Sequence, residues 1–386
     1  MVTLKFPPLH EAVFCGRPNR FVVECEVDGQ ETLASLPNPG RLLELFRPGV
    51  RLMVTEPASE KAKLPYKVVG VYRDGTPIML DTHRANDAVG FCLENKLFPG
   101  LEGATVKRRE VTWHRSRFDF LLEEDGREIY LEVKSCTLFA GTVAMFPDAI
   151  TARGRKHILE LAELADRGCR TMVLFLVQWS KADFFLPDYH TDLAFSEAMM
   201  AVKDRVDIRP YGIGWTEKLT IGTKPRLLPI PWHLVEREGR DGGCYLILLH
   251  NVDDQEITVG KLGAIKFSSG FYVYVGSARQ HLEARINRHR RLRKNHHWPT
   301  DYLRNQTQFI QAFPIRTADD LECNVAQSLS LLCDRSIARF GCSDCSCDSH
   351  LFAFDDDPRQ SKAFVDLLLR FRMERLTDFY SPDADR

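Results

Sequence analysis

Hydrophobic and polar residues alternate along residues 10–83 with the period of two that strands show. The stretches FVVECEVDGQETLASL and YKVVGVYRDGTPIMLDT each contain an Asp-Gly pair, which favours the tight turn of a hairpin. Several short strands with little helix predict a small β-barrel or sandwich, which we assign to residues 1–83.

The pattern then changes to an alternation of helices and strands. Helical periodicity or strand alternation predicts, in order, a helix, three strands, a helix, a strand and a helix, at residues 85–97, 105–113, 116–124, 127–138, 152–167, 170–178 and 191–205. This order is typical of an α/β domain, which we place at residues 84–221.

Three prolines and weak periodicity mark residues 222–241, which we interpret as a linker. A third unit with strands and a basic helix follows at residues 242–358. Residues 359–386 are predicted to be a helix with a polar end. The fold class is therefore mixed α/β.

Composition restricts the choice of partner only slightly. The 386 residues carry a net charge of −1, so overall charge indicates no partner. No apolar run approaches the roughly 20 residues of a membrane span, and the start lacks the apolar core of a signal peptide, so we expect no membrane association. The eleven cysteines are unevenly spaced, which in a reducing cytoplasm favours a metal or functional site over a disulfide framework.

Two acids and a lysine interrupt the apolar hairpin RFDFLLEEDGREIYLEVKSCTL, residues 117–138. Residues two apart on a strand share a face, so Glu132 and Lys134 point the same way, and Asp119 on the neighbouring strand can lie beside them. Two such carboxylates suit Mg²⁺ or Mn²⁺, and the lysine can orient water, which is the chemistry of phosphodiester hydrolysis. A salt-bridged patch on an exposed sheet face is the alternative interpretation.

Cations gather where the next helix begins, in FPDAITARGRKH. Arg153, Arg155 and Lys156 oppose the helix dipole there, and a bound phosphate would resolve the conflict. With His157 they are candidate nucleic-acid ligands. A solvated helix start is the alternative.

This order of elements, with D…ExK on the second and third strands, resembles the PD-(D/E)xK nuclease core. The pieces RPNRF, LPNPGRL, SRFDFLL, YLEVKSCTL and FPDAITARGRKH, across roughly residues 5–221, resemble the sugar fermentation stimulation protein family. The resemblance implies an OB-like barrel, a nuclease-like domain, DNA binding and metal-dependent cleavage. In such a barrel Arg20, Phe21 and Arg41 are candidates for the nucleic-acid surface, although a purely structural barrel is the alternative.

The chain departs from that family on the helix that opens the nuclease-like domain. Family members usually carry a glutamate there, and in the register set by Asn86 this position is Phe91. Glu94 shares a helical face with it and is a candidate substitute.

Residues 242–354 resemble a GIY-YIG-related domain through GCYLILL, VGKLGAIKFSSGFYVYVGSA, LEARINRH, DYL, LECNVA and CSDCSCDSHLF. The resemblance implies a catalytic set of Tyr245, Tyr274, Arg285 and Glu322, with His289 nearby and Glu322 as a Mg²⁺ ligand. The first motif is degenerate, so a domain that binds nucleic acid without cutting it is the alternative.

The basic helix at residues 284–295 is the clearest nucleic-acid footprint. His289, Arg290 and Arg291 are candidate contacts, and Trp298 and Tyr302 after it can stack on bases. The alternative is a solvated cationic face.

A cluster of thiols closes the third unit. Cys342, Cys345, Cys347 and His350 have the residue types of a Zn²⁺ site, and Cys323 can join them through the fold. Buried or redox-sensitive thiols are the alternative.

Together these features predict a cytoplasmic, Mg²⁺-dependent nuclease acting on DNA, with RNA as a second substrate to consider. The alternative is an inactive DNA-binding regulator, and a role in sugar metabolism follows only from the family's name.

Overall fold

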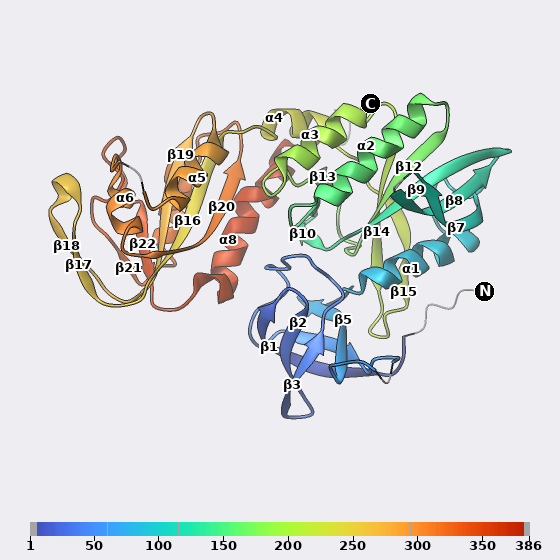
Figure 1. The fold of residues 1–386 in the computed structure, drawn as a ribbon, viewed down its shortest axis with the longest axis horizontal. Helices are drawn as coiled ribbons and strands as arrows, with labels where there is room; N and C mark the ends of the chain where they lie inside the picture. The colour runs from blue at the N-terminus through green and yellow to red at the C-terminus, as the bar shows by residue number, and fades with distance from the viewer. Residues whose placement is uncertain (1–5, 60, 115, 294, 382–386) are drawn as a thin grey trace. The chain divides into compact units, whose positions relative to one another are not determined.

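The computed structural model describes residues 6–59, 61–114, 116–293 and 295–381. The chain divides into two compact units, Met1–Trp232 with Tyr380–Arg386 and His233–Phe379. Figure 1 traces both along the chain, and each is described by itself below.

The first unit begins with a closed barrel, as the alternating pattern predicted. Its five strands are β1 (Leu9–Asn19), β2 (Val22–Val27), β3 (Gln30–Ser35), β4 (Arg51–Thr55) and β5 (Tyr66–Arg73). They pair in the order β3-β2-β1-β4-β5, and a parallel pairing of β3 with β5 closes the ring. Strand β6 (Thr76–Met79) pairs antiparallel with β5 and leads into the next domain.

A six-stranded mixed sheet follows, in the order β15-β14-β12-β9-β8-β7. Its strands are β7 (Thr105–Trp113), β8 (Ser116–Glu124), β9 (Arg127–Cys136), β12 (Arg170–Val177), β14 (Asp207–Trp215) and β15 (Ile221–Leu227). Helix α1 (Thr82–Glu94) packs on one face, and α2 (Ala152–Asp166) and α3 (Leu193–Val202) cover the other (Figure 1). A small sheet of β10 (Leu138–Ala140), β11 (Val143–Phe146) and β13 (Phe184–Pro187) lies beside it.

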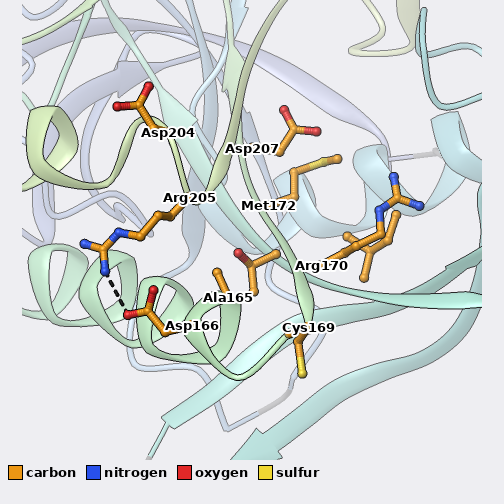
Figure 2. A pocket seen from close by; sticks show the side chains of 11 residues that line it. Ala165, Asp166, Cys169, Arg170, Met172, Asp204, Arg205 and Asp207 are labelled. Carbon is orange, nitrogen blue, oxygen red and sulfur yellow. Dashed lines mark hydrogen bonds and ion pairs between the residues drawn. The ribbon is translucent and has the colours of Figure 1, made fainter.

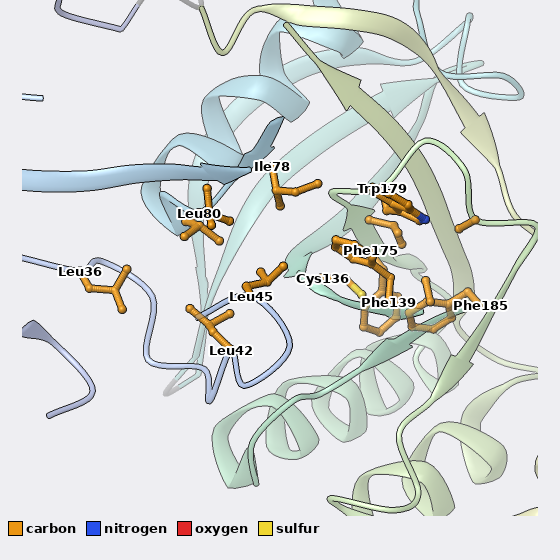
Figure 3. Close-up of a cluster of buried hydrophobic side chains, with 14 of the residues drawn as sticks. Leu36, Leu42, Leu45, Ile78, Leu80, Cys136, Phe139, Phe175, Trp179 and Phe185 are labelled. Atoms are coloured by element: carbon orange, nitrogen blue, oxygen red, sulfur yellow. The ribbon is translucent and has the colours of Figure 1, made fainter. Parts of the chain in front are cut away.

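One continuous core joins the barrel to this α/β domain. Leu42 and Leu80 belong to the same buried cluster as Phe139, Phe175 and Trp179, and Figure 3 shows the cluster. Each fully buried leucine of this kind contributes about 1.5–3 kcal/mol. The two predicted domains are therefore packed into one body, which fixes the walls of any cleft between them.

The predicted linker at residues 222–241 needs correction. Its first residues belong to β15, which pairs antiparallel with β14, and helix α4 (Trp232–Glu238) follows. Because β15 is an edge strand, Pro225 can lie in it without breaking an inner ladder. The boundary between the two compact units falls at Trp232, inside the segment.

The second unit is built on a five-stranded sheet in the order β20-β16-β19-β22-β21. Its strands are β16 (Gly243–Asn251), β19 (Gly270–Ala278), β20 (Gln308–Arg316), β21 (Arg335–Ser336) and β22 (Leu351–Phe354), with a separate hairpin of β17 (Gln255–Thr258) and β18 (Ala264–Phe267). Its helices are α5 (Leu282–Arg290), α6 (Pro299–Arg304), α7 (Glu322–Ser330) and α8 (Lys362–Arg372).

Two expectations about this unit are corrected. Helix α8, predicted as a separate tail, packs into the unit, because the ring of Phe364 contacts Phe313 and Phe354 at centroid distances of 5.7 and 6.2 Å. The basic helix expected at residues 284–295 ends at Arg290. Lys294, part of that prediction, lies outside the described residues.

Among the described residues, no helix has the length and apolar character needed to cross a membrane.

Candidate active site

Strands β8 and β9 stop pairing just where the acids lie. The last paired residues on this side are Phe120 and Leu131. Beyond them the carboxylate of Asp119 takes the place of a backbone partner, and its Oδ2 accepts the N–H of Val133 at 2.7 Å. Its Oδ1 accepts from Asn86 on α1 at 2.6 Å. The strands thus diverge around a carboxylate that is held from two sides.

Glu132 is buried in the same place, with 4 % of its surface exposed. Its Oε1 accepts from Lys134 Nζ at 2.5 Å and from His157 Nδ1 at 2.6 Å. Its Oε2 is buried and has no hydrogen-bond partner among the residues that the structure describes. A buried carboxylate oxygen without a hydrogen-bond partner lowers the stability of the fold, so Glu132 Oε2 is a candidate ligand atom for a bound cation.

The two acids titrate in opposite directions. Burial, followed by the charge of Glu132, raises the pKa of Asp119 to about 6. Burial alone would raise the pKa of Glu132 as well, but the hydrogen bond from His157 and the charge of Lys134 lower it overall. An ionised carboxylate beside one that resists ionisation is the arrangement that a shared cation would relieve.

The acids face a cleft of about 510 Å³ between the barrel and the α/β domain. Barrel-side loops contribute Arg20, Asn38 and Gly40 to its wall, and the start of α2 contributes Thr151 and Arg153. Thr151 caps α2 by accepting the N–H of Gly154 at 3.1 Å. The positive end of a helix and two arginines therefore line the cleft that holds the acids.

Glycine is required at position 40 for this close approach. A Cβ added there would lie 2.2 Å from Oδ2 of Asp148, which also lines the cleft. Oδ2 of Asp148 accepts the N–H of Leu42 at 3.3 Å. The loop of the barrel is thereby attached to the segment that precedes α2.

The predicted cations around α2 separate into different roles. Arg153 lines the cleft, and its Nε lies 3.5 Å from Nε2 of His157. Lys156 instead pairs with Glu160 at 3.5 Å, and Arg155 is absent from the cleft wall that the structure describes. His157 is 4 % exposed, so its predicted role as a nucleic-acid contact is corrected to that of a residue that orients Glu132.

Helix α1 brings the amide of Asn86 to the cleft and no carboxylate among the residues that line the described wall. Phe91 packs against the apolar core on its side of the sheet, and Glu94 is exposed, so neither lines the cleft. Glu94 therefore does not replace the missing acid. In the sequence, Asn86 serves only to set a register, because its contact with Asp119 depends on the packing of α1 against the sheet.

On the barrel, Arg20 and Phe21 form an exposed pair, with the guanidinium 4.7 Å from the ring centroid and Phe21 50 % exposed. Arg41 is exposed and its charge acts on Asp148. Arg17, which sequence reasoning did not single out, donates to the carbonyls of Arg20 and Arg41 at 2.9 and 2.5 Å. It therefore organises both segments that carry the candidate cations.

The second unit brings its four predicted catalytic residues together. Tyr245, Tyr274, Arg285 and Glu322 all line one cleft of about 600 Å³. The hydroxyl of Tyr245 lies 2.9 Å from Nε2 of His289. Burial raises the pKa of Tyr274 to about 12 and that of Tyr245 well above its usual value. At neutral pH both phenols are therefore hydrogen-bond donors and not bases.

The predicted basic surface of this unit is only partly near the cleft. Arg285 and Trp298 line it, with the guanidinium 4.4 Å from the ring centroid. His289 is 1 % exposed, so it is a buried partner of the Tyr245 hydroxyl and not a surface contact with nucleic acid. Arg290 and Arg291 are exposed but do not contribute to the described cleft wall. Tyr302, which was expected to stack on bases, does line the cleft.

The cysteine cluster differs from its prediction at one position. Ligand atoms of Cys323, Cys345, Cys347 and His350 all lie within 4.8 Å of one another. Cys342 is not part of this group, so Cys323 takes the place that the C-x₂-C spacing gave to Cys342.

A second hollow of the first unit lies at the C-terminal end of α2, remote from the acids (Figure 2). Two of its arginines are paired, Arg205 with Asp166 at 2.8 Å and Arg170 with Glu124 at 2.8 Å. Its buried polar atom without a partner among the described residues is the neutral hydroxyl Oγ1 of Thr171, whereas the cleft holds a carboxylate oxygen in that condition.

Comparison with known families covers nearly the whole chain. Residues 16–80 match the family described as "SfsA N-terminal OB domain", and residues 83–218 match "Sugar fermentation stimulation protein RE domain". Residues 244–373 match "Domain of unknown function DUF123", which is related to GIY-YIG domains. The resemblances predicted from the sequence are confirmed.

Individual relatives agree with these matches. The chain is 40 % identical over 205 residues to a sugar fermentation stimulation protein homolog of Clostridium tetani, covering 53 % of this chain and 89 % of that protein. It is 37 % identical over 199 residues to the homolog of Methanothermobacter thermautotrophicus, covering 51 % and 83 %. The solved structure of Pyrococcus furiosus SfsA in complex with Ca²⁺ matches with a TM-score of 0.54 at 32 % identity, covering 59 % of this chain and 97 % of that one.

Proposed function

The chain belongs to the sugar fermentation stimulation protein family, and from that premise we propose that its first unit is a DNA-binding nuclease dependent on Mg²⁺ or Mn²⁺. One observation carries the proposal. Two acids, the half-buried Asp119 and the buried Glu132, meet where two strands diverge, and Glu132 Oε2 has no hydrogen-bond partner among the described residues. A purely structural salt bridge would not leave that oxygen without a partner.

The donor set fits a hard divalent cation. Asp119 and Glu132 would hold it, and Asn86 offers an amide beside them. A solved relative is described in complex with Ca²⁺, another oxygen-preferring cation. When bound, the cation would stabilise negative charge on a phosphate and lower the pKa of the attacking water.

The chain's own residues have distinct parts in the reaction. Arg153 and the start of α2 bind the phosphate, and His157 keeps the carboxylate of Glu132 in place. Lys134 Nζ orients the attacking water beside the acids. Hydrolysis forms a P–O bond to that water and breaks the ester P–O bond. The proton released by the water balances the one gained by the leaving hydroxyl.

The barrel supplies the nucleic-acid surface in this proposal. Arg20 lines the same cleft as the acids, and the exposed ring of Phe21 lies beside it. Arg41 adds a further exposed cation, and a base can stack on Phe21 while the arginines bind the backbone. DNA is the first substrate to test and RNA the second. All eleven cysteines are free thiols, which fits a cytoplasmic location.

The test is cleavage of single-stranded and duplex DNA and RNA with Mg²⁺, with Mn²⁺ and with EDTA. Glu132→Gln should lower the rate on the order of 10³-fold, because losing several kcal/mol of charge stabilisation has that effect. Glu128→Gln is the matched control, since Glu128 lies on the same strand but pairs with Lys107 on the exposed side. No metal-dependent cleavage by the wild type, at any protein concentration, would overturn the nuclease proposal.

The composition of α1 favours a second candidate, a DNA-binding regulator without catalysis. At the cleft α1 presents the neutral Asn86, while Phe91 is packed in the core. A regulator of this kind keeps salt-sensitive DNA binding, in wild type and Glu132→Gln alike, and shows no turnover. A regulatory link to sugar metabolism has support only in the family's name.

The cleft of the second unit is a candidate second centre, because Tyr245, Tyr274, Arg285 and Glu322 share it. In this role Arg285 stabilises phosphate charge and Glu322 holds a divalent cation. Arg285→Ala, alone and combined with Glu132→Gln, separates the two centres. Cleavage lost in Arg285→Ala but retained in Glu132→Gln would assign the chemistry to the second unit.

A further inference from the structure

Three thiols and an imidazole converge in the second unit from parts of the chain that are distant in sequence. Cys323 lies in the first turn of α7, Cys345 and Cys347 lie in the loop between β21 and β22, and His350 immediately precedes β22. Their ligand atoms lie within 4.8 Å of one another, and Cys345 Sγ is 3.5 Å from His350 Nε2. Four donors at mutual distances of this size surround a point that one small ion can occupy.

These cysteines are not core residues. Cys244 and Cys136, which pack as small apolar side chains, are at most 1 % exposed. Cys323 is exposed, and Cys345 and Cys347 are half-buried. The apolar cluster of this unit includes none of the three. Hydrophobic burial therefore does not explain why the thiols gather.

We propose that Cys323, Cys345, Cys347 and His350 bind one zinc ion in a four-coordinate Cys₃His site. Three sulfur ligands and one imidazole nitrogen are a set typical of structural zinc and are unsuited to Mg²⁺ or Ca²⁺. Backbone hydrogen bonds join the two sides of the loop between α7 and β22 as far as Arg339 and Asp348, and Cys345 and Cys347 lie beyond them in its tip. The ion attaches this loop to the start of α7.

The zinc site also orients a residue of the cleft. His350 directs Nε2 towards the sulfurs, while its Nδ1 lies 3.1 Å from Oε1 of Glu322. The other oxygen of Glu322 accepts from Ser277 Oγ. A carboxylate that accepts the second ring N–H of a zinc-bound histidine is a recurrent arrangement, which fixes the ring and strengthens the ligand. Glu322 lines the second cleft, so the ion and the cleft share a positioning residue.

Metal content of the full chain, purified under reducing conditions, tests the site directly. The wild type should hold one zinc per chain, and Cys323→Ser and Cys347→Ser should lose it. Cys342→Ser is the matched control, a half-buried thiol in the same loop outside the cluster, and it should keep the metal. Equal loss in Cys342→Ser and Cys323→Ser would overturn the assignment of ligands.

A second measurement needs no variant and so is independent of folding defects. Co²⁺ added to the metal-free wild type should give the intense visible bands of tetrahedral coordination and the sulfur charge-transfer bands of three thiolates. Their absence, together with no zinc uptake, would overturn the proposal. A disulfide would also overturn it, and it would show as two fewer free thiols than eleven in denatured chain kept without reductant.

The link to Glu322 has its own readout. Glu322→Gln should weaken zinc binding by about 10–100-fold in competition with a chelator, as loss of such a partner typically does. Glu283→Gln, an exposed glutamate on α5, should leave it unchanged. Unchanged affinity in Glu322→Gln would overturn the coupling. None of these measurements uses cleavage, so their failure is distinguishable from failure of the proposed nuclease.

Discussion

His157 donates from Nδ1 to Oε1 of Glu132 at 2.6 Å, and the other nitrogen of its ring lies 3.5 Å from the guanidinium of Arg153. Both ring nitrogens of the imidazole therefore have a partner, one on β9 and one on α2. It joins the start of α2, where a phosphate would bind, to the carboxylate on β9 that would hold a cation. In the proposed site, this one buried ring would position the residues that bind both the phosphate and the cation.

Removal of the His157 ring should weaken Mg²⁺ binding more than it lowers the cleavage rate at saturating Mg²⁺. We expect His157→Ala to raise the Mg²⁺ concentration needed for half-maximal cleavage by about 10–100-fold, because Glu132 loses the donor that orients it. His157→Asn should recover most of the affinity, since its amide can donate from nearly the position of Nδ1. Cleavage rates over a Mg²⁺ titration measure both effects.

The control for this prediction is His83→Ala, which removes an exposed imidazole from α1. Its Mg²⁺ dependence should match the wild type. If His157→Ala and His83→Ala give the same titration curve, His157 does not position the carboxylate.

The sequence predicted local structure well where periodicity was strong. Strands at residues 105–113 and 116–124 have the predicted ends, because alternation and flanking turns define both sides of each. Asp119, Glu132 and Lys134 were identified as a group, because a hairpin places them together by local rules alone.

Contacts between residues that are distant in sequence could not be predicted from local patterns. His157 looked like another cation of a basic helix start, and only the packing of α2 on the sheet makes it a partner of Glu132. Cys342 fitted the zinc spacing better than Cys323, but α7 carries Cys323 to the thiols across the fold. β15 looked like a linker because Pro225 weakens a strand pattern that an edge tolerates.

Asp119→Asn should stabilise the metal-free chain while it abolishes cleavage. Burial and the charge of Glu132 raise the pKa of Asp119 from 3.8 to about 6, so at pH 7 its ionised form costs the fold on the order of 3 kcal/mol. Asparagine removes that cost and can still accept the N–H of Val133. We expect Tm in EDTA to rise by a few degrees at pH 7.

The stability difference between Asp119→Asn and the wild type should depend on pH. Because the pKa of Asp119 is higher in the folded chain, its stabilising contribution is complete below about 3.8 and is lost as pH rises through about 6. The advantage of Asp119→Asn should therefore shrink as pH falls from 7 to 4. Asp125→Asn, in the exposed turn of the same hairpin, should show no such trend. A constant difference in Tm across this range would contradict the assignment.

Arg20 and Phe21 should affect DNA binding in different ways. Arg20→Ala should lower the slope of log affinity against log salt by about 1, because one phosphate contact is lost. Phe21→Ala should cost about 1–3 kcal/mol of binding and leave the slope unchanged, because stacking releases no counterions. Fluorescence anisotropy of labelled single-stranded DNA, in the Glu132→Gln background with EDTA, measures both.

Arg51→Ala serves as the matched control for Arg20. Arg51 lies on β4 of the same barrel, where its guanidinium pairs with Glu11. An equal fall of the salt slope in Arg51→Ala would mean that the barrel acts through its overall charge and not through the surface beside the cleft.

Tyr274 should stay protonated well above neutral pH. Burial raises its pKa to about 12, so at pH 8 only about one molecule in ten thousand carries the phenolate. A base with so small an active fraction is inefficient, whereas a neutral phenol in a cleft beside Arg285 can donate to phosphate charge. Near-ultraviolet titration should therefore show no phenolate step below pH 10 that Tyr274→Phe removes.

Tyr272→Phe is the control, because Tyr272 lies on the same strand and donates to the carbonyl of Ser268 at 2.9 Å. A step below pH 9 that disappears only in Tyr274→Phe would assign Tyr274 the role of base instead.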